Sequence, residues 1–317
     1  MRLFLGVDGG QSSTTAVIAL EDGTVVGSGR SGPCNHVSAG EAATKFRRVL
    51  TECVNQACVA AAIDAATATF SAVCCGMSGG AEDKETLIRY ILRTERLRVV
   101  TDGEIALTGA LAGKPGIIVI SGTGSLCLGR NLEKKLARAG GWGYVFGDEG
   151  SAFDIARQAT RAALRFEEGW GPKTALHPLL LEATNQPTAN AMLHAFYSDA
   201  WPRSRVAQLA VLVDNAVGTG DAVAAAIMEQ AAQSLSMFAA CVRQQVLNSP
   251  EDVLVSYTGG AFQSGVLLAR FKQFVQLSGC VCVDPILDPA GGALLEAFQL
   301  CGIDLANLKI PHVKTLH

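Results

Sequence analysis

The 317-residue sequence predicts an α/β protein made of two related domains. The first observation is a hairpin pattern over residues 3–20, where two apolar runs flank the polar, glycine-rich turn DGGQSS. The second is a similar pattern over residues 117–129, IIVISGTGSLCLG, and the third is the alternation of strand-like and helix-like segments after each hairpin. The recurrence suggests two halves that each present one turn to a shared cleft.

The first half is predicted to have the order β-β-β-α-β-α-β-α. A third strand is expected over residues 25–27, followed by helix 42–66, strand 71–76, helix 83–94, strand 97–101 and helix 102–111. Residues 27–32 match the GxGxxG spacing, but Pro33 and Asn35 follow where a dinucleotide-binding fingerprint needs a helix start, so we reject that match. The GKPG run at residues 113–116 predicts a linker.

The second half repeats this order with an insertion. The expected elements are strand 136–139, a glycine-dense loop over 140–151, helix 152–166, a helical insertion over 170–215, helix 222–246, strand 253–257, helix 266–277, strand 281–283 and helix 291–301. We therefore assign residues 1–115 and approximately 303–317 to an N-terminal domain, and residues 116–302 to a C-terminal domain.

Composition limits the class of partner. Hydrophobic residues make up 49% of the chain and charged residues 17%, with a formal net charge of −3, which is typical of globular enzymes and predicts no nucleic-acid partner. No stretch approaches the roughly 18 apolar residues of a membrane span, and we expect neither a signal peptide nor a membrane partner. The ten cysteines contain no C-x-x-C pair, which disfavours zinc sites and predicts buried thiols in a cytoplasmic protein.

The first turn carries groups that suit a metal-bound phosphate. Asp8 offers a carboxylate, Ser12 and Ser13 offer hydroxyls, and the glycines leave backbone N–H groups uncovered. The alternative is an ordinary hairpin in which Asp8 only suits an Asp-Gly turn. The recurrence of a hydroxyl-bearing glycine turn over residues 122–125 favours phosphate binding.

Further candidate residues each have a plainer alternative. Asp102 follows a strand and begins a helix, so it suits either a general base or a helix N-cap, and the two roles can coexist. Asp148 lies in the glycine-dense loop, where Trp142 suits either a sugar face or the core. Gly259 and Gly260 suit a close approach to a ring or phosphate, or a tight turn, and Asn35 suits sugar hydroxyls or turn chemistry.

Six motifs together resemble a known family. They are GVDGGQSST (6–14), CNH (34–36), VTDG (100–103), ISGTGS (120–125), GGWGYVFGDEGSAF (140–153) and TGGAFQS (258–264). They are similar to the N-acetylglucosamine kinases, and more broadly to the ATPase family that includes activators of benzoyl-CoA reductase and hydroxyacyl-CoA dehydratase. The resemblance implies two ribonuclease H-like (actin-like ATPase) domains with an interdomain cleft, as in actin and hexokinase.

The resemblance also implies roles for individual residues. Asp8 would organise Mg²⁺ through water, and Asp102 would be the catalytic base and contact the substrate. The ATP phosphates and adenosine would be held by Gly9, Gly10, Ser12, Ser13, Gly122, Thr123, Gly124, Gly259, Gly260 and Ser264. The sugar would be bound by Asn35, Gly141, Trp142, Gly143 and Asp148. Gln11 stands where relatives often have a third glycine, so the first phosphate loop would be tighter.

These residues predict ATP-dependent phosphorylation of the 6-hydroxyl of N-acetylglucosamine by a cytoplasmic homodimer, with glucosamine as the nearest alternative substrate. A rival is a reductase-activating ATPase, which would need thiolate ligands for an iron–sulfur cluster. Cys127, Cys241, Cys280 and Cys282 provide no convincing ligand set in the sequence. A non-catalytic sugar sensor is the third interpretation, and the presence of both Asp8 and Asp102 disfavours it.

Overall fold

The structure is a computed structural model that describes residues 2–10, 13–34, 41–79, 82–247 and 253–309. The chain divides into two compact units, which we call the N-terminal unit (Met1–Pro115 and Asp284–His317) and the C-terminal unit (Gly116–Val283). The first boundary lies where the GKPG run predicts a linker. The return to the N-terminal unit lies at Asp284, so our expected boundary near residue 303 is wrong.

The N-terminal unit contains a five-stranded sheet in the order β3-β2-β1-β4-β5. Its strands are β1 (Leu3–Gly9), β2 (Thr14–Leu20), β3 (Val25–Ser31), β4 (Ala72–Met77) and β5 (Leu97–Thr101). The first three form an antiparallel meander, and β4 and β5 are parallel to β1. Its helices are α1 (Glu41–Ala60), α2 (Glu82–Ile91), α3 (Asp102–Ala110) and α11 (Pro289–Leu300), with a short 3₁₀ turn at Leu305–Asn307.

Alternate residues of β1 build separate cores on the two faces of this sheet. Leu5 and Val7 join the cluster beneath α1 and α2, whereas Phe4 joins the cluster of α11 and α3. The rings of Phe4 and Phe298 lie 4.4 Å apart between centroids. Because side chains alternate along a strand, one short segment supports helices on both faces, which fixes the position of its carboxyl end.

The close approach of α11 explains why it belongs to the N-terminal unit. A Cβ on Gly292 would lie 1.9 Å from the carbonyl oxygen of Ile105, and one on Gly109 would lie 2.4 Å from that of Asp288. A Cβ on Gly6 of β1 would lie 2.4 Å from the backbone nitrogen of Leu294. Glycines on three elements therefore let α11 pack directly on α3 and β1, a contact between residues distant in sequence that helical periodicity alone does not reveal.

Helix α1 packs against β3 in the same manner. A Cβ on Gly27 would lie 2.2 Å from the carbonyl oxygen of Ala57, and one on Gly29 would lie 2.1 Å from that of Cys53. Strand β3 continues to Ser31, beyond the predicted end at residue 27. The glycine spacing that formally matched a nucleotide fingerprint therefore serves helix-on-strand packing.

Helix α1 ends at Ala60, six residues before its predicted end. The N–H of Ile63 donates to Cys58 O at 2.9 Å and the N–H of Ala62 donates to Val59 O at 3.0 Å, the two bonds of a Schellman motif. Ala62 adopts a left-handed conformation with φ 55°. Glycine usually occupies this position, so the alanine-rich sequence gave no sign of the helix end.

The C-terminal unit repeats the sheet topology in the order β10-β9-β6-β7-β8. Its strands are β6 (Gly116–Ser121), β7 (Ser125–Arg130), β8 (Leu136–Gly140), β9 (Val253–Thr258) and β10 (Cys280–Cys282). As in the other unit, a meander is followed by two strands parallel to its first strand. This match confirms the predicted duplication of an α/β half.

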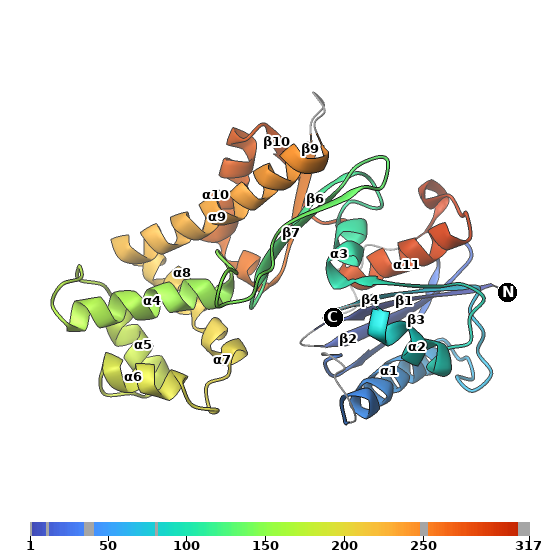
Figure 1. The fold of residues 1–317 in the computed structure, drawn as a ribbon, viewed down its shortest axis with the longest axis horizontal. Coiled ribbons are helices and arrows are strands. Elements are labelled where there is room, and N and C mark those ends of the chain that lie inside the picture. Colours follow the sequence, from blue (N-terminus) through green and yellow to red (C-terminus); the bar gives the residue numbers. More distant parts are fainter. Residues whose placement is uncertain (1, 11–12, 35–40, 80–81, 248–252, 310–317) are drawn as a thin grey trace. The chain divides into compact units, whose positions relative to one another are not determined.

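Helices α9 (Ala222–Val246) and α10 (Gly265–Leu277) pack along this second sheet, and a 3₁₀ turn at Gly260–Gln263 precedes α10. The predicted insertion forms α5 (Leu176–Thr184), α6 (Ala189–Phe196), α7 (Arg203–Gln208) and α8 (Ala210–Gly218). These four helices gather around α4 (Ala152–Glu167) (Figure 1). The insertion thus extends the core of the C-terminal unit beyond its duplicated part.

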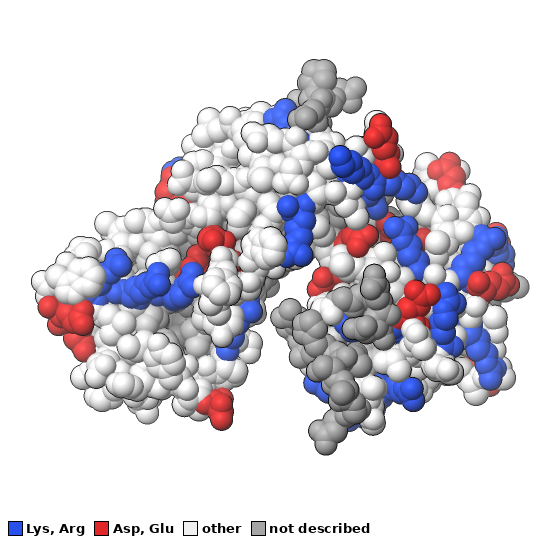
Figure 2. Space-filling model, viewed as in Figure 1, with Lys and Arg blue, Asp and Glu red and all other residues white. Residues whose placement is uncertain are grey.

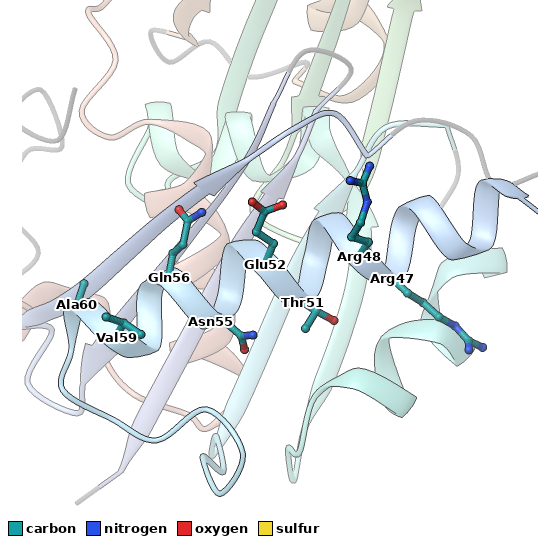
Figure 3. A pocket seen from close by; sticks show the side chains of 8 residues that line it. All are labelled: Arg47, Arg48, Thr51, Glu52, Asn55, Gln56, Val59 and Ala60. Atoms are coloured by element: carbon teal, nitrogen blue, oxygen red, sulfur yellow. The ribbon is translucent and has the colours of Figure 1, made fainter.

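The surface carries mixed charge. On the face shown in Figure 2, basic and acidic side chains are interspersed within each unit. A shallow depression follows α1, where Arg47, Arg48 and Glu52 lie along the helix (Figure 3). Ser31 Oγ donates to Glu52 at 2.9 Å, so part of this surface fastens α1 to β3. No predicted site residue that the structure describes lines this depression.

Within the described residues, no helix has the length and apolar character needed to cross a bilayer.

The glycine contact beneath α11 gives a stability prediction. Gly292→Ala would place a methyl group against backbone atoms of α3 that cannot rotate away, so we expect the free energy of unfolding to fall by about 1–3 kcal/mol or more. Urea denaturation measures this change. Gly218→Ala is the matched control, because no atom of the described residues lies within 4 Å of a Cβ there, and it should leave stability nearly unchanged or slightly higher. Equal effects of the two substitutions would contradict the packing argument.

Candidate active site

The first candidate turn lies at the carboxyl end of β1. Asp8 is the sixth residue of this strand, paired with Thr15 on one side and Gly76 on the other. The N–H of Gly10 donates to Ser13 O at 3.0 Å, and the N–H of Ser78 donates to Gly9 O at 3.0 Å. Backbone hydrogen bonds therefore hold the described parts of the turn on both sides. Gln11 and Ser12 lie outside the described residues.

Asp8 lies in an acidic, partly buried environment. Burial, followed by the nearby carboxylates of Asp102 and Asp288, raises the pKa of Asp8 to about 7. Asp288 is the N-cap of α11, and its Oδ1 accepts from the N–H of Gly291 at 2.7 Å. Asp288 was not predicted, although its position before Pro289 and a helical run is a recognisable N-cap signal.

Asp102 lies at the same edge of the sheet, after β5. The N-cap of α3 is Thr101, which forms a capping box with Glu104, so Asp102 is not the helix cap. Its Oδ2 instead accepts a hydrogen bond from Ser78 Oγ, and its Oδ1 accepts from the N–H of Gly103 at 2.9 Å. The cap interpretation is wrong because the neighbouring threonine already satisfies the helix N-terminus.

Two residues behind Asp102 were not predicted. Ser78 is buried, and its carbonyl oxygen accepts a hydrogen bond from Nζ of Lys84, which is only 1% exposed. Ser78 follows β4, so it stands at the carboxyl edge where open α/β sheets bind ligands. That position was the available sequence signal for Ser78. The buried lysine had none, because its amphipathic helix predicts a solvated side chain.

The second candidate turn, residues 122–125, joins β6 and β7. The N–H of Gly122 donates to Gly124 O at 2.9 Å, and the N–H of Ala152 donates to Gly122 O at 2.9 Å. Ser125 Oγ donates to Glu149 O at 2.7 Å, which connects this turn to the glycine-dense loop. The structure therefore brings together two motifs that lie some twenty-five residues apart in the sequence.

Asp148 occupies a buried position between these motifs. Its backbone is left-handed, with φ 64°, and its Oδ1 accepts from the N–H of Ser125 at 3.2 Å. Its Oδ2 pairs with Nη2 of Arg203 at 2.7 Å. Arg203 was not predicted, because it lies on α7 of the insertion, far from either motif in the chain.

The remainder of the glycine loop presents large side chains to solvent. Gly141 and Gly143 adopt positive φ angles of 72° and 80°, which carry the backbone through conformations that other residues avoid. Trp142 between them is 73% exposed, with the Arg138 guanidinium 5.3 Å from its ring centre. Trp142 is therefore not a core residue, and the core interpretation is wrong.

The third glycine motif lies beside the second turn. Gly259 has φ 107°, and a Cβ there would lie 2.3 Å from Ser121 O and 3.0 Å from Gly122 N. No atom of the described part of the chain lies within 4 Å of the position that a Cβ would take on Gly260. Ser264 caps α10 and donates its hydroxyl to Asp214, so its side chain already has two structural partners. Asn35, the predicted sugar ligand, lies outside the described residues.

Two kinds of metal site follow from the sequence, Mg²⁺ beside Asp8 and, in the rival interpretation, an iron–sulfur cluster held by thiolates. Within the described residues, no three His, Cys, Asp or Glu side chains are arranged to hold one metal ion. Mg²⁺ is usually held by one or two carboxylates together with phosphates and water, so the acidic surroundings of Asp8 fit such an ion. Cys127 lies on β7, whereas Cys280 and Cys282 lie on β10, with β9 and β6 between them. These three thiols therefore do not share one ligand set.

Comparisons with known proteins agree with these motifs. Residues 5–297 match the model of the BadF/BadG/BcrA/BcrD ATPase family. The chain is 34% identical to the N-acetylmuramic acid/N-acetylglucosamine kinase of Clostridium acetobutylicum, covering 95% of this chain and 100% of the relative. It is 29% identical to the N-acetyl-D-glucosamine kinase of Dictyostelium discoideum, covering 94% and 98%.

A solved structure has the same fold. The crystal structure of a protein from Chromobacterium violaceum, provisionally assigned as an N-acetylglucosamine kinase, superposes on this chain with a TM-score of 0.75 at 26% sequence identity. The match covers 93% of this chain and 98% of the other. It supports the two-unit α/β architecture that the sequence predicted.

The raised pKa of Asp8 gives a pH-dependent prediction. Between about pH 4 and pH 7 the folded chain keeps a proton that the unfolded chain has lost, so stability falls as pH rises through this window. Asp8→Asn removes this penalty and should be more stable than the parent at pH 8, on the order of 1–3 kcal/mol, with a smaller difference at pH 5.5. Urea denaturation without divalent cations at both pH values measures this.

Asp22→Asn is the matched control. Hydrogen bonds from the N–H and hydroxyl of Thr24 lower the pKa of Asp22, so it is ionised in both states throughout this range. Its substitution should have the same effect at pH 5.5 and pH 8. A stability difference for Asp8→Asn that does not change with pH would refute the assignment of Asp8 as the titrating group.

Proposed function

We propose that this chain, which belongs to the BadF/BadG/BcrA/BcrD ATPase family, is an ATP-dependent kinase that phosphorylates the 6-hydroxyl of N-acetylglucosamine. The observation that carries the proposal is the setting of Asp102: Thr101 caps the helix, while Ser78 orients the Asp102 carboxylate at the ligand-binding edge of the sheet. The names of two relatives that match nearly the whole chain support this substrate class.

In the proposed reaction Asp102 is the general base. A carboxylate oxygen of Asp102 accepts the proton of the attacking sugar hydroxyl. As the proton leaves, the sugar oxygen forms a bond to the γ-phosphorus of ATP, and the bond from that phosphorus to ADP breaks. Hydrogen bonds from Ser78 and from the Gly103 N–H fix the direction of the remaining lone pairs. The role of Ser78 is therefore to hold the base in place rather than to contact the reacting atoms.

Asp8 is proposed to hold Mg²⁺ through water. When bound, Mg²⁺ neutralises charge on the phosphate oxygens. The acidic neighbours that raise the pKa of Asp8 also favour a cation beside it. Gly9, Gly10 and Ser13 are proposed to face phosphate oxygens from the same turn, where a side chain at Gly9 would collide with Met77.

The C-terminal unit is proposed to contact the phosphates of ATP through the 122–125 turn and to contact part of the sugar. Among the described residues, no atom lies within 4 Å of the position that a Cβ would take on Gly122, which leaves room for a ligand beside it. Trp142 offers an exposed ring face to the sugar. Asp148 already accepts two hydrogen bonds, yet a carboxylate has about four acceptor positions, so it retains capacity for a sugar hydroxyl.

An amino-sugar panel tests the proposal. The rate of ATP consumption, followed with a coupled assay that detects the released ADP, should be higher with N-acetylglucosamine than with glucosamine, N-acetylmannosamine or N-acetylmuramic acid. The last is included because one relative is named for both sugars. Phosphorus NMR of the product should locate the phosphate on the 6-oxygen. Turnover confined to glucosamine would select the alternative substrate, and ATP hydrolysis indifferent to every sugar would reject the kinase proposal.

Two further expectations stay predictions of this proposal. The homodimer is tested by sedimentation of the purified protein. The cytoplasmic location is supported by the ten cysteines, all of which are free thiols in the structure.

Asp102→Asn tests the base directly. Asparagine keeps the shape but cannot take the proton, so kcat should fall by about 10²–10⁴. Because Thr101 and not Asp102 caps α3, the melting temperature should barely change. Sugar binding, measured by calorimetry, should weaken only modestly.

The control is Thr101→Ala. It removes the cap hydroxyl and should lower stability by about 1 kcal/mol while retaining most of the turnover. An Asp102→Asn enzyme with near-normal kcat would remove Asp102 from the mechanism and direct attention to Asp148.

A further inference from the structure

We propose that Arg203, on the helical insertion, is a positioning residue that holds the 122–125 turn in its phosphate-binding shape and ties it to the glycine loop. This inference rests on the proposed function for its kinetic consequence, but its structural part concerns the C-terminal unit alone. It gives the insertion a role in the site, which its position in the sequence did not suggest.

Arg203 and Asp148 together hold the 122–125 turn by hydrogen bonds at two positions. Nη2 of Arg203 donates to Thr123 O at 3.0 Å and to Asp148 Oδ2 at 2.7 Å. The other oxygen of Asp148 accepts from the N–H of Ser125 at 3.2 Å. The guanidinium–carboxylate pair therefore binds one carbonyl and one N–H of the same turn, on either side of Gly124.

The pair is shielded from water. The Asp148 side chain is 5% exposed and the Arg203 side chain 31% exposed. The guanidinium lies 5.2 Å from the ring centre of Tyr144 and 5.7 Å from that of Phe153. Removing the arginine would leave a buried carboxylate without its counter-charge, so the effect should exceed that of an exposed surface pair.

The glycine at position 124 fits this arrangement. A Cβ there would lie 2.8 Å from Nη2 of Arg203 and 2.9 Å from Oδ2 of Asp148. A side chain at position 124 would thus displace the pair. Glycine at position 124 therefore leaves the space beside the turn that the Arg203 and Asp148 side chains occupy.

Arg203 reaches the turn because of where α7 begins. Pro202 precedes the helix with φ −60° and ψ 156°, and Arg203 is its first helical residue. Helix α7 packs against α4, whose N-cap Ser151 ends the glycine loop. The insertion, α4 and the two motifs therefore form one packed assembly within the C-terminal unit.

The test compares Arg203→Met with the parent and with Arg205→Met. The methionine keeps much of the apolar contact with Tyr144 but loses both hydrogen bonds. Because the turn is proposed to hold ATP, kcat/KM for ATP should fall about ten- to a hundredfold, mainly through a higher KM. Arg205 lies on the same helix, stacks on Trp201 at 4.0 Å and donates to Ala200 O, so its substitution should leave the kinetics unchanged.

Two readouts do not depend on kinase activity. Amide hydrogen exchange at Ser125 should accelerate in Arg203→Met, because Asp148 loses its anchor. Calorimetry with a non-hydrolysable ATP analogue, without sugar, should show weaker binding. If the parent phosphorylates no amino sugar, the proposed function fails while these two measurements still decide the role of Arg203.

Arg203→Lys covers the case in which the methionine variant fails to fold. Lysine retains the charge but not the planar group, so it should fold and restore only part of the ATP affinity. Combining Arg203→Met with Asp148→Asn should cost less than the product of the two single effects, because the residues act as a unit. A folded Arg203 variant with parental Ser125 exchange and parental nucleotide affinity would overturn the proposal.

Discussion

The direct packing of α11 on α3 and β1 is the constraint on which the N-terminal half of the candidate site depends. Gly6, Gly109 and Gly292 allow backbone to approach backbone, so the three elements have little freedom to slide. The carboxyl end of β1 and the N-termini of the two helices carry Asp8, Asp102 and Asp288. The repulsion that Asp102 and Asp288 exert on the ionised form of Asp8 therefore depends on the backbone contacts between α11, α3 and β1.

In the C-terminal unit, the feature that needs stabilising is the glycine-dense loop over residues 140–151. A loop rich in glycine has high conformational entropy when unfolded, and its fixed shape must be stabilised by specific bonds. Arginines from three elements supply them: Arg138 donates to Gly140 O and Gly141 O, Arg157 donates to Tyr144 O, and Arg203 pairs with Asp148. The loop thus keeps a defined backbone without burying its large side chains.

The sequence was sufficient for most of the architecture, and its failures have physical causes. The duplicated order of strands was predictable because apolar periodicity and turn glycines are local signals. The end of α1 was not, since Ala62 adopts a conformation usually reserved for glycine. The unit boundary was missed because it depends on α11 contacting β1, which is a long-range contact.

The candidate site divides in the same way. Asp8 and Asp102 were singled out from a turn and a strand end, and the recurrence of a glycine turn favoured phosphate binding over an ordinary hairpin for the Asp8 turn alone. Ser78 and Arg203 act through hydrogen bonds to residues 24 and 80 positions away in the chain, and Lys84 is a buried lysine on a helix whose pattern predicts a solvated side chain. Apart from the place of Ser78 after β4, no local pattern could therefore reveal their roles. The sequence therefore indicated the residues proposed to contact the ligand more readily than the residues that hold these ligand-contacting side chains in place.

The exposure of Trp142, Val145 and Phe146 on a hydrogen-bonded loop has a thermodynamic consequence. Apolar side chains in water carry a hydration shell whose loss lowers the heat capacity of the system. A ligand that covers this loop should therefore bind with a negative heat capacity change. Its binding enthalpy would become more favourable with rising temperature even though the loop backbone itself does not reorganise.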